Sequence, residues 1–144
     1  MKKLKDVMTR DVEVIGPEAT IREAAAKMKA LDVGPLPVCD GERVVGMLTD
    51  RDITVRATAE GRDPTTTKVR EAMTSAVVSL LEDQDVEEAA RLMQAHQLRR
   101  LLVMGRDGHV AGIVALGDLA VETGDERRVG QVLEGISEPS EPER

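Results

Sequence analysis

The sequence predicts an α+β fold made of two β-α-β-β-α repeats that pack together. The first observation is an internal repeat, because Leu4–Val38 aligns without a gap on Val69–Val103. The second is that both copies carry the same succession of strand, helix, hairpin and helix signals. A repeat of this length does not bury its apolar face alone. We therefore expect the two repeats to pack about a pseudo-twofold axis as short mixed sheets flanked by helices.

Each copy begins with a short lead-in that ends in a Met-Thr pair. These pairs are Met8-Thr9 and Met73-Thr74. A brief apolar stretch follows each of them, over residues 12–15 and 77–80. Runs of this kind, rich in Val, Ile and Leu, predict the first strand of each copy.

Capping boxes then predict the start of a helix in each copy. Thr20 with Glu23, and Asp85 with Glu88, place a side-chain acceptor three residues before a Glu. The residues that follow put apolar side chains on one helical face. In the two copies these are Ile21, Ala24, Ala25, Met28 and Leu31, and Val86, Ala89, Ala90 and Met93.

A hairpin and a last helix complete each copy. The turn pairs Asp40-Gly41 and Asp107-Gly108 separate two apolar runs, which is a strong hairpin signal. The hairpins are predicted over residues 36–48 and 101–114, and the last helices over 50–59 and 116–123.

The predicted domain organisation follows from these elements. Residues 1–60 form the first repeat, 61–68 a linker that contains Asp63-Pro64, and 69–123 the second repeat. Residues 124–144 are predicted to be a short C-terminal helix and a disordered acidic tail, because they become rich in Pro, Ser and Glu.

Composition excludes several classes of function. There is no Phe, Tyr or Trp, so no base can stack on an aromatic ring. The net charge is -7 with dispersed Lys and Arg, which argues against a nucleic acid partner. No apolar run approaches a membrane span, and the basic start leads into Asp6 rather than an apolar signal segment. The single Cys39 fits a reducing compartment, so we expect a cytoplasmic protein.

The chain resembles a tandem pair of cystathionine-β-synthase (CBS) domains, of the stand-alone bacterial type. The resemblance spans about residues 3–122 and is carried by three motifs that each occur twice. They are Asp6-Val-Met-Thr9 with Glu71-Ala-Met-Thr74, Gly34-Pro-Leu-Pro-Val38 with Arg99-Arg-Leu-Leu-Val103, and Gly46-Met-Leu-Thr-Asp-Arg-Asp52 with Gly112-Ile-Val-Ala-Leu-Gly-Asp118. The resemblance implies an adenosine-containing ligand (AMP, ADP, ATP, sometimes S-adenosylmethionine or a dinucleotide) in a cleft between the repeats. It also implies a homodimer that regulates a protein partner without catalysis.

Thr49 and Asp52 have chemistry that suits this ligand. Thr49 leads from a strand into a helix, where free backbone N–H groups and the helix dipole favour phosphate. Asp52 follows one turn later, and an ionised carboxylate accepts hydrogen bonds only, as a ribose diol requires. The resemblance implies the same two roles. The same spacing is also that of a helix cap, and both interpretations stay open.

The two copies differ at the residues before the middle strand. The resemblance implies that this pair holds phosphate and reaches across from the opposite repeat. Because Arg99 and Arg100 stand where the first copy has Gly34-Pro35, we expect one competent site, made by Thr49, Asp52, Arg99 and Arg100. The related cleft would be vestigial, with Ala115, Asp118, Gly34 and Pro35. The resemblance places adenine near Thr9, Val12 and Pro37, although Val12 also reads as plain core.

Two other functions stay open. A ligand-free dimerisation or stress-response module is favoured by Ala115, by Pro35 and by the absence of aromatic residues. A nucleotide-hydrolysing enzyme would need a metal-binding carboxylate cluster, a nucleophile with its base, or a glycine-rich phosphate loop. None is recognisable in the sequence, and one Cys with two His has no zinc-site spacing. We therefore predict a sensor without enzymatic activity, required cofactor or metal.

Overall fold

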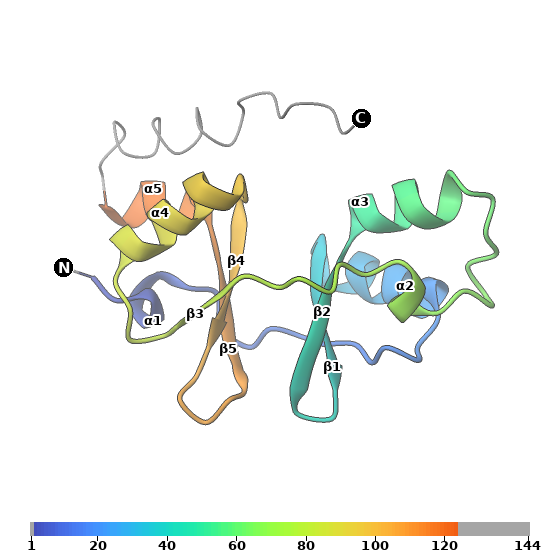
Figure 1. Ribbon diagram of the computed structural model, residues 1–144, viewed down its shortest axis with the longest axis horizontal. Helices are drawn as coiled ribbons and strands as arrows, with labels where there is room; N and C mark the ends of the chain where they lie inside the picture. Colours follow the sequence, from blue (N-terminus) through green and yellow to red (C-terminus); the bar gives the residue numbers. More distant parts are fainter. Residues whose placement is uncertain (1, 124–144) are drawn as a thin grey trace. The chain divides into compact units, whose positions relative to one another are not determined.

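The computed structural model describes residues 2–123 and divides the chain into two compact units (Figure 1). Unit 1 joins the stretch that ends at Asp11 to the stretch that begins at Val78, and unit 2 is Val12–Val77. Each unit combines helices with a small sheet, so the predicted α+β class is confirmed. The predicted C-terminal helix and acidic tail, 124–144, lie outside the described residues.

Unit 2 is built on a two-stranded antiparallel sheet. Its strands pair from Pro35 with Thr49 to Asp40 with Arg43. In chain order, its elements are α2 (Ile21–Leu31), β1 (Pro35–Asp40), β2 (Arg43–Thr49), α3 (Asp50–Asp52), a π-helix (Ile53–Thr58) and a 3-10 turn (Val69–Glu71).

Unit 1 is built on a three-stranded mixed sheet. β3 runs parallel to β4, and β4 pairs antiparallel with β5, from Arg100 opposite Ala115 to Met104 opposite Val110. Its elements are α1 (Leu4–Val7), β3 (Ser79–Leu81), α4 (Val86–His96), β4 (Arg100–Met104), β5 (Val110–Ala115) and α5 (Leu116–Thr123). Within residues 2–123, no helix has both the length and the apolar character that a membrane crossing needs.

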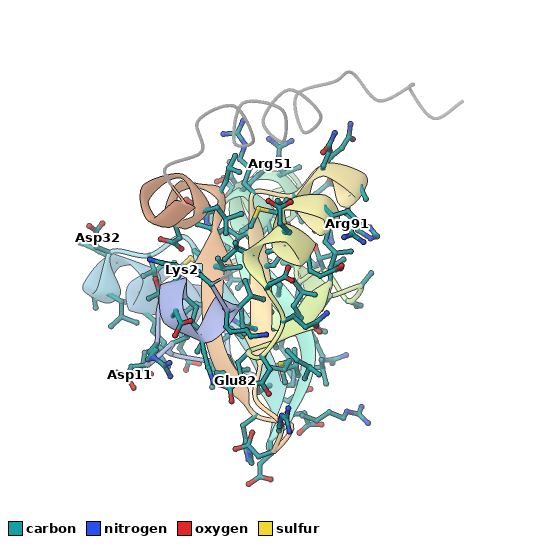
Figure 2. All side chains as sticks on the ribbon, turned by 90° about the vertical axis from the view of Figure 1, so that its left-hand side faces the viewer. Lys2, Asp11, Asp32, Arg51, Glu82 and Arg91 are labelled. Carbon is teal, nitrogen blue, oxygen red and sulfur yellow. The ribbon has the colours of Figure 1, made fainter. Side chains whose placement is uncertain are left out.

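The predicted helix starts are confirmed for α2 and α4, although only the Thr20 box is reciprocal. Thr20 and Glu23 exchange two hydrogen bonds of 3.1 Å at the start of α2, and Asp85 accepts from the Glu88 N–H at the start of α4. Both helices end in a left-handed residue, Asp32 with φ 54° and Gln97 with φ 55°. Among residues other than glycine, Asn and Asp adopt this conformation most often, as Asp32 does here. Figure 2 shows Asp32 at the outer end of α2.

The lead-in of the first sequence repeat packs in unit 1. α1 buries Leu4 and Val7, together with Met8, in the core that α4, β4 and β5 form. Thr9 then pairs with Ile113 of β5 through two backbone hydrogen bonds of 2.9 and 3.1 Å. The amino-terminal lead-in therefore supplies part of the core of the second repeat.

The second repeat contributes its lead-in to unit 2 in the same way. Val69 and Ala72 are buried in the core formed by α2, β1 and β2, and Met73 packs against it. Thr74 pairs with Met47 of β2 through two hydrogen bonds of 2.9 Å. The compact units therefore have different boundaries from the repeats in the sequence.

A glycine in each hairpin makes this exchange possible. A Cβ atom added at Gly112 would overlap the Thr9 carbonyl oxygen, far inside van der Waals contact. At Gly46 the added atom would lie 2.6 Å from the Met73 sulfur and 2.9 Å from the Thr74 carbonyl oxygen. The Met-Thr pairs and the glycines recur together in the two repeats because they occupy the same crossing.

Two local predictions were wrong in detail. The strand predicted at 12–15 does not form, because only Ile15 bridges to Val38, while the Val14 carbonyl accepts from the Lys27 ammonium at 2.7 Å. The helix predicted at 50–59 is an α-turn that becomes a π-helix, with the Ala59 N–H donating to the Thr54 carbonyl at 2.8 Å. The consecutive β-branched residues Ile53, Thr54 and Val55 lower the α-helix propensity of this segment.

We predict that Gly112→Ala lowers the free energy of unfolding by about 1–3 kcal/mol, because the new methyl group meets a backbone oxygen that cannot rotate away. Urea denaturation measures the loss. Gly16→Ala is the matched control, since a Cβ there has nothing within 4 Å. Equal stability of the two variants would contradict the close crossing.

A second prediction concerns the exchange of lead-ins. Leu4→Ala should cost roughly 2–5 kcal/mol by opening a cavity, and amide exchange should rise first in α4, β4 and β5. Val69→Ala, which removes fewer atoms at the equivalent position, should cost less and should affect α2, β1 and β2 first. Hydrogen exchange with mass spectrometry distinguishes these patterns. Faster exchange that begins in the mutated residue's own repeat would contradict the observed packing.

Candidate functional site

The hairpin register determines which residues surround the last helix of each repeat. In an antiparallel pair, the first residues of one strand lie beside the last residue of the next. Arg100 is accordingly opposite Ala115, and the Leu116 N–H donates to the Arg99 carbonyl at 2.9 Å. The start of α5 therefore has two arginines beside it.

The first repeat has the same register with different residues. Pro35 is opposite Thr49, and the Asp50 N–H donates to the Gly34 carbonyl at 3.0 Å. A Cβ at Gly34 would lie 3.3 Å from a carboxylate oxygen of Asp50. The start of α3 therefore has a glycine, a proline and a carboxylate beside it, where the second repeat has guanidinium groups.

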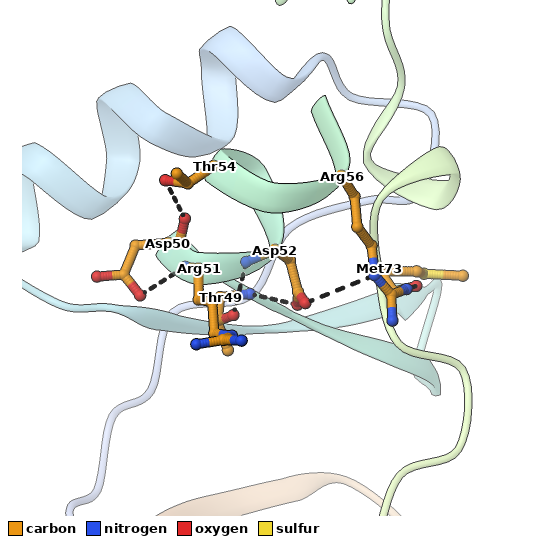
Figure 3. Close-up of polar contacts among 7 residues, drawn as sticks. All are labelled: Thr49, Asp50, Arg51, Asp52, Thr54, Arg56 and Met73. Atoms are coloured by element: carbon orange, nitrogen blue, oxygen red, sulfur yellow. Dashed lines mark hydrogen bonds and ion pairs between the residues drawn. The ribbon is translucent and has the colours of Figure 1, made fainter. Parts of the chain in front are cut away.

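Thr49 and Asp52 form a reciprocal capping box (Figure 3). The Thr49 hydroxyl accepts from the Asp52 N–H at 3.1 Å, and Asp52 Oδ2 accepts from the Thr49 N–H at 3.0 Å. Of the two interpretations that the sequence left open, the cap is confirmed. It does not exclude a ligand, because a carboxylate and a hydroxyl each have further lone pairs.

The expectation of free N–H groups at this turn was wrong. The Asp50 N–H donates to Gly34, the Arg51 N–H to Asp50 Oδ1 at 2.9 Å, and the Asp52 N–H to Thr49. The reason is that the side chains of Thr49 and Asp50 fold back on the backbone. Residues of these types commonly do so at turns and helix starts.

The start of α5 has only one of the two hydrogen bonds of this capping box. Asp118 Oδ2 accepts from the Ala115 N–H at 2.8 Å, as Asp52 does from Thr49. Ala115 has no hydroxyl to return the bond. Among residues 2–123, the N–H groups of Gly117 and Asp118 consequently have no acceptor.

A pocket of about 340 Å³ lies at this helix start. Its walls are Arg99, Arg100, Ala115, Leu116 and Gly117. Arg99 and Arg100 thus lie beside Ala115 in their own repeat, whereas the cleft expected from Ala115, Asp118, Gly34 and Pro35 stays a prediction. The missed signal was the hairpin register: counting outward from Asp107-Gly108 brings the first residues of one strand to the last residues of the other.

The residues predicted to hold adenine lie in different units. Thr9 belongs to unit 1, where it pairs with Ile113. Val12 is half-buried in unit 2, and Pro37 of β1 accepts from the Ile15 N–H at 3.0 Å through its carbonyl. Their role as base-binding residues stays a prediction.

Cys39 has the properties of a structural thiol. Partial burial raises its pKa above the ordinary value, which disfavours the reactive thiolate. In the part of the chain that the structure describes, no three His, Cys, Asp or Glu side chains are grouped as a metal site requires.

The repeated unit, the paired hairpins and the two helix-start carboxylates define a tandem two-repeat module. Residues 4–57 and 69–123 match the family model described as CBS domain. The chain therefore belongs to the CBS-domain family as a CBS pair, and the resemblance seen in the sequence is confirmed.

Relatives and solved structures agree with this assignment. The chain is 44% identical over 137 residues to the CBS domain-containing protein YhcV of Bacillus subtilis (strain 168), covering 95% of this chain and 96% of YhcV. It is similar to Hypoxic Response Protein I with two coordinated zinc ions (34% identity, TM-score 0.75, 85% and 99% coverage). It is also similar to the CBS domain pair of protein MJ0100 in complex with 5′-methylthioadenosine and S-adenosyl-L-methionine (26% identity, TM-score 0.76, 86% and 97% coverage).

We predict that Thr49→Ala lowers stability by about 1 kcal/mol, because the Asp52 N–H loses its acceptor. Thr49→Ser keeps the hydroxyl and should stay within about 0.5 kcal/mol of the unmodified protein. Chemical denaturation of both variants measures the difference. A Ser variant as unstable as the Ala variant would show that the methyl group, rather than the cap, matters.

Proposed function

We propose that this CBS pair is a non-catalytic sensor of an adenosine-containing ligand that carries phosphate, such as AMP, ADP or ATP. The observation that carries the proposal is the pocket beside α5, which two arginines line. The proposal assigns phosphate to Arg99 and Arg100, and it assigns ribose hydroxyls to a helix-start carboxylate, Asp52 or Asp118.

The chemistry of the pocket favours an anion. In a chain of net charge -7, two adjacent arginines are exposed, and within residues 2–123 neither has an ion-pair partner. Arg offers a planar fork of donors that matches phosphate oxygens. The N–H of Gly117, which also lines the pocket, adds a backbone donor at a helix start.

The two carboxylates suit a sugar. Asp52 and Asp118 each give one oxygen to a backbone N–H and keep acceptor capacity on both oxygens. A ribose diol supplies two O–H donors. The complex of the MJ0100 pair with two adenosine compounds supports a ligand of this class.

The base would lie against aliphatic and backbone groups, since the chain has no aromatic residue. Thr9, Val12 and Pro37 are the proposed contacts. Hydrogen bonds from backbone groups, rather than stacking, would then distinguish adenine from other bases.

The proposed output is a change in conformation or in a homodimer that a protein partner recognises. A ligand shifts such an equilibrium only by its different affinity for the two states. A role without catalysis is supported by the match to the CBS domain-containing protein YhcV, which covers nearly the whole length of both chains and names no activity.

We predict that millimolar AMP, ADP or ATP raises the melting temperature. For a dissociation constant of about 10 µM, 1 mM ligand stabilises the fold by about 2.7 kcal/mol, which corresponds to a shift of several degrees. The double variant Arg99→Ala/Arg100→Ala should lower affinity for AMP about tenfold or more and leave adenosine binding nearly unchanged. Calorimetric titration measures both ligands.

Arg91→Ala is the matched control, because it removes an exposed arginine from α4. A double-mutant cycle of Arg100→Ala with Asp118→Ala and with Asp52→Ala shows which carboxylate shares a ligand with the arginines. Unchanged melting across AMP, ADP, ATP, NAD and S-adenosylmethionine would contradict the proposal and favour a ligand-free interaction module. Phosphate release from ATP that Asp52→Asn abolishes would indicate an enzyme instead.

A further inference from the structure

The carboxylate of Asp52 is held from two sides (Figure 3). Its Oδ2 accepts from the Thr49 N–H at 3.0 Å, and its Oδ1 lies 4.0 Å from Nε of Arg56. The Asp52 side chain is 15% exposed and that of Arg56 is 51% exposed. The pair therefore lies at the surface with the carboxylate on its inner side.

Arg56 is anchored at its other end by the backbone. Its Nη1 donates to the Met73 carbonyl at 3.1 Å. Met73 is part of the lead-in that packs in unit 2, and the next residue, Thr74, is paired with Met47. Among the described residues, the Met73 carbonyl has Arg56 as its hydrogen-bond partner, so this contact ties the guanidinium to a fixed part of the core.

Because the terminal torsion of an Asp side chain is broad, one hydrogen bond does not determine the plane of its carboxylate. A contact on each oxygen does. Here one contact is a hydrogen bond from the Thr49 N–H at the end of β2, and the other is an ion pair at 4.0 Å, longer than a hydrogen bond, with a guanidinium that donates to the Met73 carbonyl. Both oxygens can then accept from a ligand in a defined direction.

We propose that Arg56 is a positioning residue for ribose recognition, which orients the Asp52 carboxylate so that it reads the 2′- and 3′-hydroxyls together. This inference rests on the proposed role of Asp52 in binding the sugar. It assigns to Arg56 the discrimination between ribose and deoxyribose ligands, through Asp52 and without contact to the ligand.

The sequence of the second repeat has no arginine at the position equivalent to Arg56. The residue four positions after Asp118 is Glu122, where the first repeat has Arg56 four positions after Asp52. Asp118 is held by the Ala115 N–H on one oxygen. The inference therefore predicts that selectivity for the ribose hydroxyls depends on Asp52 and Arg56.

The test measures the ratio of the dissociation constants for 2′-deoxy-AMP and AMP by calorimetric titration. The variants are Asp52→Asn, Arg56→Gln and Arg56→Lys, in the full chain. Arg91→Gln is the matched control, since Arg91 projects from α4 and pairs with Glu88 at 2.9 Å as another exposed helix arginine (Figure 2). Melting temperatures report whether each variant is folded.

The expected ratio for the unmodified protein is about tenfold, the usual size of one hydrogen bond to a charged group. Asp52→Asn should bring it close to one, Arg56→Gln to about threefold or less, and Arg56→Lys to an intermediate value. Arg91→Gln should keep the full ratio. A merely structural role of Arg56 would weaken both ligands equally and leave the ratio unchanged.

The outcomes separate this inference from the proposed function. If AMP binds with a high ratio that Arg56→Gln retains, the inference is overturned and the sensor proposal stands. If Asp52→Asn retains the ratio, the hydroxyls are read elsewhere and the inference is again overturned. If the unmodified protein binds neither nucleotide, or binds both equally, the ribose role of Asp52 fails and the role of Arg56 fails with it.

Discussion

The close crossing of each Met-Thr lead-in over a hairpin glycine is the constraint on which the rest of the structure depends. At Gly112 the Thr9 carbonyl occupies the space of a side chain, and at Gly46 Met73 and Thr74 do so. The crossing lets α1 complete the core of the second repeat and the Val69–Glu71 turn complete that of the first. Each core takes most of its residues from one repeat and its lead-in from the other, so each repeat needs the other to complete its core. A substitution at one crossing is therefore expected to destabilise a core whose other residues are distant in the sequence.

The two hairpins have the same register, but they place different residues beside the helix that follows. In unit 2, Thr49 and Asp50 satisfy the helix start themselves, and Gly34 and Pro35 bring no charge. In unit 1, Ala115 leaves that start open beside two arginines. The repeats share the carboxylates Asp52 and Asp118, but they differ at the aligned pairs Gly34/Arg99, Pro35/Arg100, Thr49/Ala115 and Asp50/Leu116. This asymmetry is the physical basis of the proposed sensor.

Much of the fold could be predicted because its signals are local. The boxes at Thr20 and Asp85 act over three residues, and the Asp-Gly turns act over two. The helix after Asp50 was predicted, but its π form was not, since π-helices are rare and have no sequence pattern as plain as the α-helical period. The candidate site was half predicted. Residue types such as Asp52 and Arg100 were recognisable, but their partners were not.

The amino-acid sequence alone established the duplication, the α+β class, the starts of α2 and α4, and the family. These could be predicted because repeats, helix caps and turns each depend on residues that are close together in the sequence. Three features depended on tertiary contacts: the exchange of lead-ins, the arginines beside Ala115, and the tie from Asp52 through Arg56 to Met73. Each of these contacts joins groups that are 15 or more residues apart, such as Arg100 and Ala115 or Arg56 and Met73. Such contacts are decided by the packing of the whole unit, which local propensity does not encode.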